Sequence, residues 1–244
     1  MIDNPFHLRG KRVLVTGASS GIGRAIAIEC AHAGATVIAT ARDAERLAQT
    51  RAGMGEGAHL VVPADLADPA QMTALVEQAG AIDGVVHSAG IQGLTPMRMM
   101  RKSFLDQVID TNFMAPAMLT QKLLAAKSLR NGASIVFLSS IAAHTGTVGV
   151  GAYSASKGAI EGLLRVLALE VAPRAMRVNA LAPGLIDTPL VNGDRAFLEE
   201  KGRAYPLGLG QPEDVAYAAV YLLADISRRV SGVSLHIDGG IPWT

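Results

Sequence analysis

Short apolar runs alternate with helix-like segments along most of the chain, and this alternation limits the folds that it can adopt. The runs are mostly apolar on both faces, which is typical of strands buried in a parallel sheet. The pattern predicts strands at about 11–16, 36–40, 59–65, 82–90, 134–140, 176–183 and 233–238. Helices are predicted from the glycines at 17–23 to about His32, and at about 43–51, 68–79, 102–128, 151–172 and 212–225. The sequence therefore predicts a single α/β domain, residues 1–244, with a Rossmann-type, doubly wound parallel sheet of about seven strands and helices on both faces.

The composition fits such a fold and argues against several kinds of partner. Half of the 244 residues are hydrophobic and 18% are charged, which is enough for a core on both faces of a sheet. The formal net charge of +1 argues against nucleic acid or an acidic membrane surface as a partner. No run approaches the ~20 apolar residues of a membrane span, and the N-terminus lacks a signal-peptide pattern. We therefore expect a cytoplasmic protein without a metal site, in which the single cysteine, Cys30, is a small buried hydrophobic residue.

A glycine-rich segment, Thr16 to Gly23, connects the first predicted strand to the first helix. Glycines at such a place let the backbone approach a pyrophosphate, and the free N–H groups of a helix N-terminus attract negative charge. The segment therefore predicts a dinucleotide site, although an ordinary glycine turn would also fit it in isolation. In a doubly wound sheet, this ligand binds at the carboxyl ends of the strands.

The glycine spacing is G-x-x-x-G-x-G, and two further motifs follow it in order, Ser88-Ala89-Gly90 and Tyr153-x-x-x-Lys157. Together they resemble the motifs of the short-chain dehydrogenase/reductase family, over about residues 11–240. The resemblance implies an oxidoreductase that uses NADP or NAD. It also implies cofactor-binding roles for Gly17, Ser19, Ser20, Gly21, Ile22, Gly23, Asp65, Leu66, Ser88, Ala89, Gly90, Tyr153, Lys157, Pro183, Gly184, Ile186 and Thr188. The family usually has asparagine where this chain has His87 and Ser88, and we interpret His87 as a packed, hydrogen-bonded substitute.

The end of the second predicted strand bears on the choice between NAD and NADP. An acidic residue there would accept hydrogen bonds from the adenosine ribose and repel a 2′-phosphate. This chain has Ala41 and Arg42 instead, and the resemblance to NADP-using members implies that Arg42 pairs with the phosphate. A solvated arginine at a helix start is the alternative. We expect NADP because of Arg42, but Ser20 stands where many NADP users have a basic residue, and this keeps NAD open as the second choice.

Tyr153 and Lys157 lie four residues apart on a predicted helix, so both project from one face. The resemblance adds Ser140, thirteen residues before Tyr153, and Asn112 as the other members of a catalytic tetrad. Carbonyl reduction needs a proton at the oxygen, and a free tyrosine, with a pKa of ~10, is a poor base at neutral pH. We expect Lys157 and the oxidised nicotinamide to lower the pKa of Tyr153. Ser140 would hydrogen-bond the substrate oxygen, and Asn112 would hold a water that links Lys157 to solvent.

Other interpretations of these residues stay open. A Tyr-x-x-x-Lys pair is common on amphipathic helices, Ser140 could cap a strand, and Asn112 could be a hydrogen-bonding residue inside a helix. A non-catalytic dinucleotide sensor with the same fold is the alternative function, although a sensor would not need proton-transfer groups.

The substrate is expected to be a small carbonyl compound or alcohol, enclosed by the loop after Gly90, by 142–150 and by about 189–206. Met97 and Met99 could form an apolar mouth or pack on a helix, and His144 is interpreted as a solvated loop residue. The resemblance makes reduction of a 3-oxoacyl thioester or acyl-carrier-protein derivative one candidate, while small alcohols and sugars stay open. It also implies a homotetramer that pairs through the helices at 102–128 and 151–172, whose apolar character could equally reflect burial in one subunit.

Overall fold

The structure is a computed structural model that describes residues 4–190, 200 and 202–241. Its centre is a seven-stranded sheet in which every strand runs parallel to its neighbours. The strands are β1 (Arg12–Thr16), β2 (Thr36–Ala41), β3 (Leu60–Pro63), β4 (Ile82–His87), β5 (Leu129–Leu138), β6 (Arg177–Pro183) and β7 (Ser234–Ile237). Their order across the sheet is β3-β2-β1-β4-β5-β6-β7, which confirms the predicted doubly wound sheet.

The strand order reverses between β1 and β4, in the middle of the sheet. Thr16, the last residue of β1, lies between Thr40 of β2 and His87 of β4. After β3 the chain crosses back over β2 and β1 to enter β4, so the connections on either side lead away from this point. Open α/β sheets bind ligands beyond the carboxyl ends of the strands at such a reversal.

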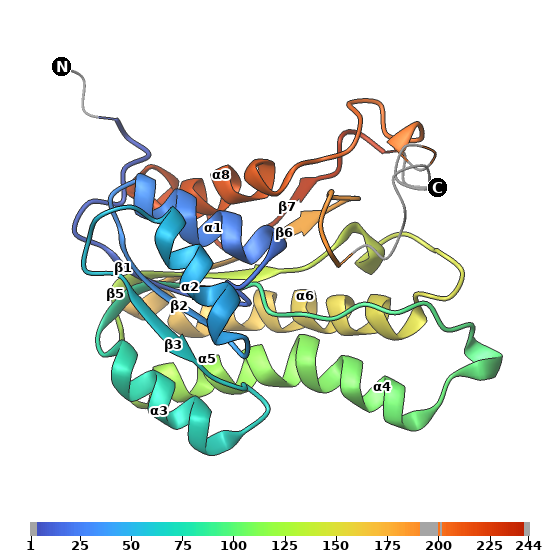
Figure 1. Cartoon of the computed structure of the whole chain (residues 1–244), viewed down its shortest axis with the longest axis horizontal. Coiled ribbons are helices and arrows are strands. Elements are labelled where there is room, and N and C mark those ends of the chain that lie inside the picture. The colour runs from blue at the N-terminus through green and yellow to red at the C-terminus, as the bar shows by residue number, and fades with distance from the viewer. Residues whose placement is uncertain (1–3, 191–199, 201, 242–244) are drawn as a thin grey trace.

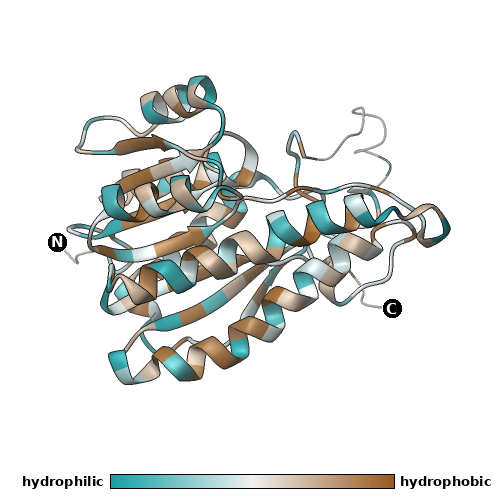
Figure 2. Ribbon diagram, turned by 90° about the horizontal axis from the view of Figure 1, so that it is seen from below, coloured by the Kyte–Doolittle hydropathy of each residue, from teal (hydrophilic) through white to brown (hydrophobic). Residues whose placement is uncertain are grey.

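Helices cover both faces of the sheet (Figure 1). On one face lie α1 (Gly21–His32), α2 (Ala44–Gly53) and α8 (Pro212–Leu223), and on the other lie α3 (Pro69–Ala79), α4 (Lys102–Ile109), α5 (Ala115–Ala125) and α6 (Gly151–Val171). Successive strand residues alternate between the two layers: Val13 and Val15 belong to the core cluster of Ile26, whereas Leu14 belongs to that of Leu75. Figure 2 shows hydrophobic residues along the strands, as expected for a sheet that is buried on both faces.

The helix predicted at 102–128 is divided into three parts. A π-helical turn, Asp110–Met114, separates α4 from α5, and the helix ends at Ala125 because β5 begins at Leu129. The prediction missed both features. β5 starts earlier than expected because Leu129 pairs with Ile82, while the register then shifts to pair Ser134 with Gly84. The residues of β5 between Leu129 and Ser134 therefore interrupt the regular pairing with β4, and the apolar pattern of the sequence gives no sign of this interruption.

Capping side chains and a proline define the starts of two helices. The Asp68 side chain accepts hydrogen bonds from the N–H groups of Ala70 and Gln71, as an N-cap residue does. Pro212 lies in the first turn of α8, where Gln211 and Asp214 form a capping box. Cys30 is fully buried, as expected, and burial raises the pKa of its thiol. Within the described parts of the chain, no helix combines the length and apolar character needed to cross a bilayer.

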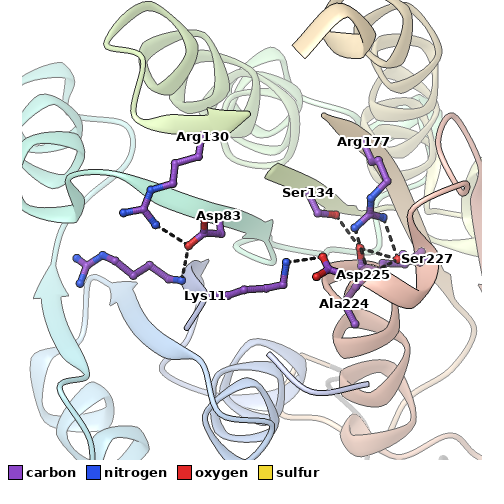
Figure 3. A network of polar contacts seen from close by, with 10 residues as sticks. Lys11, Asp83, Arg130, Ser134, Arg177, Ala224, Asp225 and Ser227 are labelled. Carbon is purple, nitrogen blue, oxygen red and sulfur yellow. Dashed lines mark hydrogen bonds and ion pairs between the residues drawn. The ribbon is translucent and has the colours of Figure 1, made fainter. Parts of the chain in front are cut away.

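A polar network lies where several strands begin, at the end of the sheet away from the carboxyl ends (Figure 3). The Asp83 carboxylate accepts hydrogen bonds from the Arg12 backbone N–H and from Arg130, both at 2.8 Å. Lys11 and Asp225 form an ion pair at 2.7 Å. The buried Arg177 donates to Ser227 at 2.9 Å, which ties β6 to the segment after α8. Side chains therefore hold this end of the sheet together, and the glycine segment lies at the opposite end.

Candidate active site

A cavity of about 1720 Å³ opens at the carboxyl ends of the strands. Its wall is made by the loops after β1, β2, β3, β4, β5 and β6 and by the first turns of α6. Every site residue predicted from the sequence lines this cavity except Asn112, which is buried behind the wall. The structure therefore brings residues from distant parts of the chain to one place.

The glycine segment forms one end of the cavity and has no room for side chains. Gly17 has a φ of +65°, and a Cβ there would lie 2.7 Å from the Ala89 backbone. A Cβ on Gly23 would lie 2.3 Å from the Gly17 carbonyl oxygen. Ser20 is the N-cap of α1 but makes no side-chain capping hydrogen bond, so the first N–H groups of the helix are left for a ligand.

Thr16 joins the two strands on either side of the reversal, and sequence reasoning missed it. Its Oγ1 accepts hydrogen bonds from the N–H groups of Ser88, at 3.1 Å, and Ala89, at 3.2 Å. These two N–H groups therefore leave the sheet, which explains why β4 ends at His87 and not at Gly90 as predicted. A β-branched hydroxyl residue directly before the glycines was the signal available in the sequence.

Arg24 and Thr50 hold the glycine segment from the side of α2, and they were also missed. The Arg24 guanidinium donates to the Ser19 carbonyl at 2.5 Å and to the Thr50 hydroxyl at 3.2 Å. Thr50 in turn donates to the Ala18 carbonyl at 2.8 Å. Two carbonyl groups of the segment are thus taken up by the protein, so that its N–H groups can face the cavity.

The loop after β2 brings two arginines to the cavity. Arg42 is exposed on the rim, and Arg46, which was not predicted, lines the cavity as well. Asp43 caps α2 by accepting from the Arg46 N–H at 3.0 Å, and the two side chains also form an ion pair at 3.3 Å. Nearby, the Asp65 carboxylate accepts from the Ala67 N–H at 3.0 Å in a local turn. Asp43 therefore offsets the charge of Arg46, and Arg42 is the arginine of this rim that forms no ion pair with a described residue.

Ser140, Tyr153 and Lys157 lie together at the opposite end of the cavity. The side chains of Tyr153 and Ser140 line the same wall, and hydrogen bonding from Ser140 favours the ionised form of the phenol. The Lys157 ammonium lies 5.4 Å from the centroid of the Tyr153 ring and donates to the Leu138 carbonyl at 2.6 Å. The adjacent Ser139 points the other way, since successive residues of a strand face opposite sides, and it donates to a carboxylate behind the wall.

Burial dominates the pKa values of this group. It raises the pKa of the Tyr153 phenol, and the hydrogen bond with Ser140 only partly opposes the change. Burial also lowers the pKa of Lys157 to about 8. Desolvation thus favours the neutral form of both groups and opposes the lowering of the Tyr153 pKa that was expected from Lys157 and the oxidised nicotinamide together.

Asn112 lies in the π-helical turn and fixes the backbone just after Gly90. Its Oδ1 accepts from the Ile91 N–H at 2.8 Å, and its Nδ2 donates to the Ile91 carbonyl at 2.9 Å and to the Ser156 hydroxyl at 3.1 Å. A Cβ on Gly90 would lie 3.3 Å from Asn112 Oδ1 and 3.8 Å from Lys157 Nζ. Asn112 thus links the loop after β4 to the catalytic helix.

The loop after β6 closes the cavity between its two ends. The Gly184 N–H donates to the Ile237 carbonyl at 3.0 Å, and Ile186 forms a parallel bridge with Gly210. These contacts fix the backbone from Pro183 onward. A Cβ on Gly21 would lie 3.3 Å from Thr188 Cγ2, so the loop reaches the glycine segment.

The segments predicted to enclose the substrate are only partly described. The Thr95 N–H donates to the Gly149 carbonyl at 2.8 Å, which joins the loop after β4 to the 142–150 segment. Both loops contribute apolar side chains to the cavity, among them Leu94 and Val148. Met97 and Met99 are exposed and do not line it. Of the predicted 189–206 segment, residues 191–199 and 201 lie outside the described residues, and Tyr205 lines the cavity.

The sequence-based interpretations of two histidines near the site, His87 and His144, can be compared with the structure. His87 is packed and hydrogen-bonded, as predicted: its ring stacks on Phe137, its Nε2 lies 2.9 Å from the Thr120 hydroxyl, and burial lowers its pKa to about 3. His144 is an exposed loop residue, as interpreted, but it is not only solvated. Its Nε2 forms an ion pair at 2.8 Å with the buried carboxylate of Glu161, a partner seventeen residues away that the sequence did not reveal.

Comparisons with known proteins agree with this arrangement. The family model described as "Enoyl-(Acyl carrier protein) reductase" matches residues 17–242. The 3-oxoacyl-[acyl-carrier-protein] reductase FabG of Pseudomonas aeruginosa is 36% identical over 245 residues, covering 96% of this chain and 98% of that protein. The (3R)-3-hydroxyacyl-CoA dehydrogenase of Canis lupus familiaris is 34% identical, with 98% of each chain covered. A short-chain dehydrogenase/reductase from Serratia marcescens has a similar structure, with a TM-score of 0.90, 30% identity, and coverage of 96% of this chain and 98% of that one.

Proposed function

Because the chain belongs to the short-chain dehydrogenase/reductase family, we propose that it is an NAD(P)-dependent enzyme that interconverts a carbonyl compound and a secondary alcohol. The observation that carries this proposal is that Ser140, Tyr153 and Lys157 line one cavity together with the glycine segment. The hydroxyl groups of Tyr153 and Ser140 can meet one substrate oxygen, the first as an acid and the second as a hydrogen-bond donor.

The glycine end of the cavity fits a dinucleotide. Side chains at Gly17 or Gly23 would meet backbone atoms, and the N-terminus of α1 has N–H groups that no capping side chain takes up. Both are what a pyrophosphate requires. The nicotinamide of a bound NADP or NAD would give up or accept the hydride. The residues proposed to hold the cofactor are Gly17, Ser19, Ser20, Gly21, Ile22, Gly23, Arg42, Asp65, Leu66, Ser88, Ala89, Gly90, Tyr153, Lys157, Pro183, Gly184, Ile186 and Thr188.

Tyr153 would give its proton to the carbonyl oxygen in reduction and take one from the alcohol in oxidation. Burial raises the pKa of the phenol, which keeps it protonated near neutral pH and suits it to the first task. Ser140 would donate a hydrogen bond to the same oxygen as negative charge develops there. Lys157 would bind the nicotinamide ribose and favour the phenolate once the proton has left. Asn112 would act as a positioning residue through Ile91 and Ser156.

NADP is the proposed cofactor, with NAD as the alternative. Arg42 lies exposed on the rim, next to Ala41, where a carboxylate would select against a 2′-phosphate. An arginine can bind phosphate oxygens through two parallel hydrogen bonds. Arg46 lies on the same rim, where its charge is offset by its ion pair with Asp43.

The substrate is proposed to carry its carbonyl next to an apolar group. Leu94, Ile141 and Val148 line the same cavity as Ser140, and their apolar side chains favour a 3-oxoacyl thioester over a sugar. The similar proteins named as acyl reductase and hydroxyacyl dehydrogenase support this choice. A rice relative, 36% identical over 263 residues and covering 96% of this chain and 86% of that protein, is named as a glucose and ribitol dehydrogenase homolog, so sugar alcohols belong in any test.

A homotetramer is part of the proposal. Met114 and Met118, around the start of α5, and Val166 and Leu169, on α6, are exposed, with fractions of 42%, 42%, 56% and 77%. Apolar side chains in such numbers on two adjacent helices favour burial against another copy of the chain. Light scattering of the purified protein checks the assembly.

Absorbance of the reduced nicotinamide tests the enzymatic proposal. The purified protein is mixed with NADPH or NADH and a panel of ketones, 3-oxoacyl thioesters and sugars, and in the other direction with NADP or NAD and the matching alcohols. We expect consumption of NADPH with an acyl thioester. Tight cofactor binding without any turnover across the panel would favour the dinucleotide sensor instead.

A further inference from the structure

A buried carboxylate on the catalytic helix joins three separate segments behind the cavity wall. Glu161 of α6 is 6% exposed. Its Oε1 accepts hydrogen bonds from the hydroxyls of Ser139, at 2.8 Å, and Ser234, at 3.0 Å, and its Oε2 forms an ion pair with His144 Nε2 at 2.8 Å. A buried carboxylate is costly unless donors surround it, so these three partners act on it together.

These contacts bracket Ser140. Ser139 comes directly before Ser140, and His144 follows it by a few residues, across the short helix Ile141–Ala143. Both side chains are tied to Glu161, which lies about two turns after Tyr153 on the same helix. The Ser140 hydroxyl is thus held between two anchored residues, and its distance from the phenol depends on how they are fixed to α6.

The segment between the two anchors is itself ordered by short-range hydrogen bonds. Ser140 Oγ accepts from the Ala142 N–H at 3.2 Å, and the His144 N–H donates to the Ile141 carbonyl at 2.8 Å. The Ser154 hydroxyl donates to the Ala142 carbonyl, which ties the segment to the first turn of α6. These hydrogen bonds connect His144 to Ser140, so a change at His144 is expected to affect the position of the Ser140 hydroxyl.

Other titratable groups face His144 from β7 and the residues after it. The rings of His144 and His236 meet edge to face, with centroids 5.4 Å apart. Burial, and then the nearby His144, lower the pKa of His236, while Asp238 and Glu161 oppose the change. The backbone of Asp238 in turn packs against Gly184, where a Cβ would lie 3.0 Å from its Cα. The ion pair therefore lies among side chains that also support the loop after β6.

We propose that His144 and Glu161 are a positioning pair for Ser140: they hold its hydroxyl at the Tyr153 phenol without touching the substrate. The inference rests on the proposed function, because only that function gives Ser140 and Tyr153 a task. It assigns a specific role to two residues outside the tetrad implied by the sequence.

A double-mutant cycle tests this role. We expect His144→Ala to lower kcat by about tenfold to a hundredfold, as misplacement of a catalytic group does, while the NADPH dissociation constant stays within about twofold. His144→Gln, which keeps a donor near the position of Nε2, should recover most of kcat. In a Ser140→Ala background, His144→Ala should have almost no further effect. An equal loss in both backgrounds, or a loss that follows NADPH affinity, would show that His144 is only structural.

The matched control is His32→Ala, which removes an exposed histidine that pairs with Glu29 at 3.2 Å on α1. It should leave kcat unchanged. A second readout does not need turnover: the near-ultraviolet absorbance of the Tyr153 phenolate, taken as the difference from the corresponding Tyr153→Phe protein. His144→Ala should raise the pH at which this signal appears, because the Ser140 hydrogen bond lowers the phenol pKa. If His144→Ala shifts the phenolate titration but the wild type turns over no substrate, the proposed function is overturned and the positioning pair is not. If the wild type turns over substrate but His144→Ala changes neither kcat nor the phenolate titration, the positioning pair is overturned and the proposed function is not.

Discussion

The ammonium of Lys157 lies 5.4 Å from the centroid of the Tyr153 ring, in a place where burial favours the neutral form of both groups. Burial raises the pKa of the phenol and lowers that of the ammonium to about 8. The phenol is therefore protonated near neutral pH and ready to act as an acid. This state suits carbonyl reduction better than alcohol oxidation, which needs a base at the same position.

Replacing Tyr153 by phenylalanine removes the proposed acid and little else. We expect kcat to fall by about a hundredfold to ten-thousandfold, the usual contribution of general acid catalysis, while NADPH still binds. Steady-state rates and a fluorescence titration of NADPH measure the two effects. Tyr217→Phe, at an exposed position on α8, is the control and should change neither. Turnover that survives in Tyr153→Phe would rule out the proposed mechanism.

Arg42→Ala tests the choice of cofactor. A charged hydrogen-bonding pair contributes about 1.5–3 kcal/mol, so the NADPH dissociation constant should rise at least about tenfold, with little change for NADH. Calorimetric titration with both cofactors measures the ratio. Arg165→Ala, at an exposed position on α6, serves as the matched loss of charge. If Arg42→Ala weakens the binding of NADPH and of NADH equally, Arg42 does not bind the 2′-phosphate.

Gly23→Ala tests the close approach of α1 to the glycine segment. The added Cβ would lie 2.3 Å from the Gly17 carbonyl oxygen, so the backbone must shift and the protein should lose about 1–3 kcal/mol of stability along with cofactor affinity. Urea unfolding and NADPH titration measure the two losses. Gly162→Ala is the control, because a Cβ there has nothing within 4 Å and should stabilise α6 by about 0.5–1 kcal/mol. Equal behaviour of the two variants would contradict the packing argument.

His87 makes the fold sensitive to acid. Its pKa is lowered by burial from 6.5 to about 3, so the unfolded chain binds a proton between these values and the folded chain does not. The stability that the neutral ring contributes is complete above pH 6.5 and is lost as the pH falls toward 3. Between pH 7 and pH 5 the wild type should therefore lose about 2 kcal/mol more than His87→Asn. Urea unfolding at both pH values measures this. His32→Asn, which replaces an exposed ring, should not reduce the loss.

The fold could be predicted from the sequence because it depends on local sequence patterns. Apolar runs such as Val13 to Val15, and start signals such as Asp68 and Pro212, depend only on near neighbours in the chain. They place strands and helices, and a parallel sheet then brings the strand ends to one edge. Tyr153 and Lys157 needed only the helical repeat to be placed on one face.

The remaining features depend on contacts between distant segments. His144 and Glu161 meet only because the 141–150 segment folds back on α6, and nothing near His144 in the sequence announces a buried carboxylate. The hydrogen bond from Arg24 to Thr50 joins α1 to α2, two helices that are separate in the sequence. The raised pKa of Tyr153 was not foreseen for a related reason. The direction of the pKa shift depends on how deeply the phenol is buried, and residue spacing does not reveal burial.

The π-helical turn around Asn112 sets the rotational phase between α4 and α5. A π turn spans more residues than an α turn, and successive helical residues are about 100° apart around the axis. Deleting one residue between Asp110 and Met114 would restore regular winding but swing the Asn112 amide away from Ile91. Evolution of this sequence is therefore expected to keep the length of the turn and Asn112 itself, because losing either would separate the loop after β4 from α6.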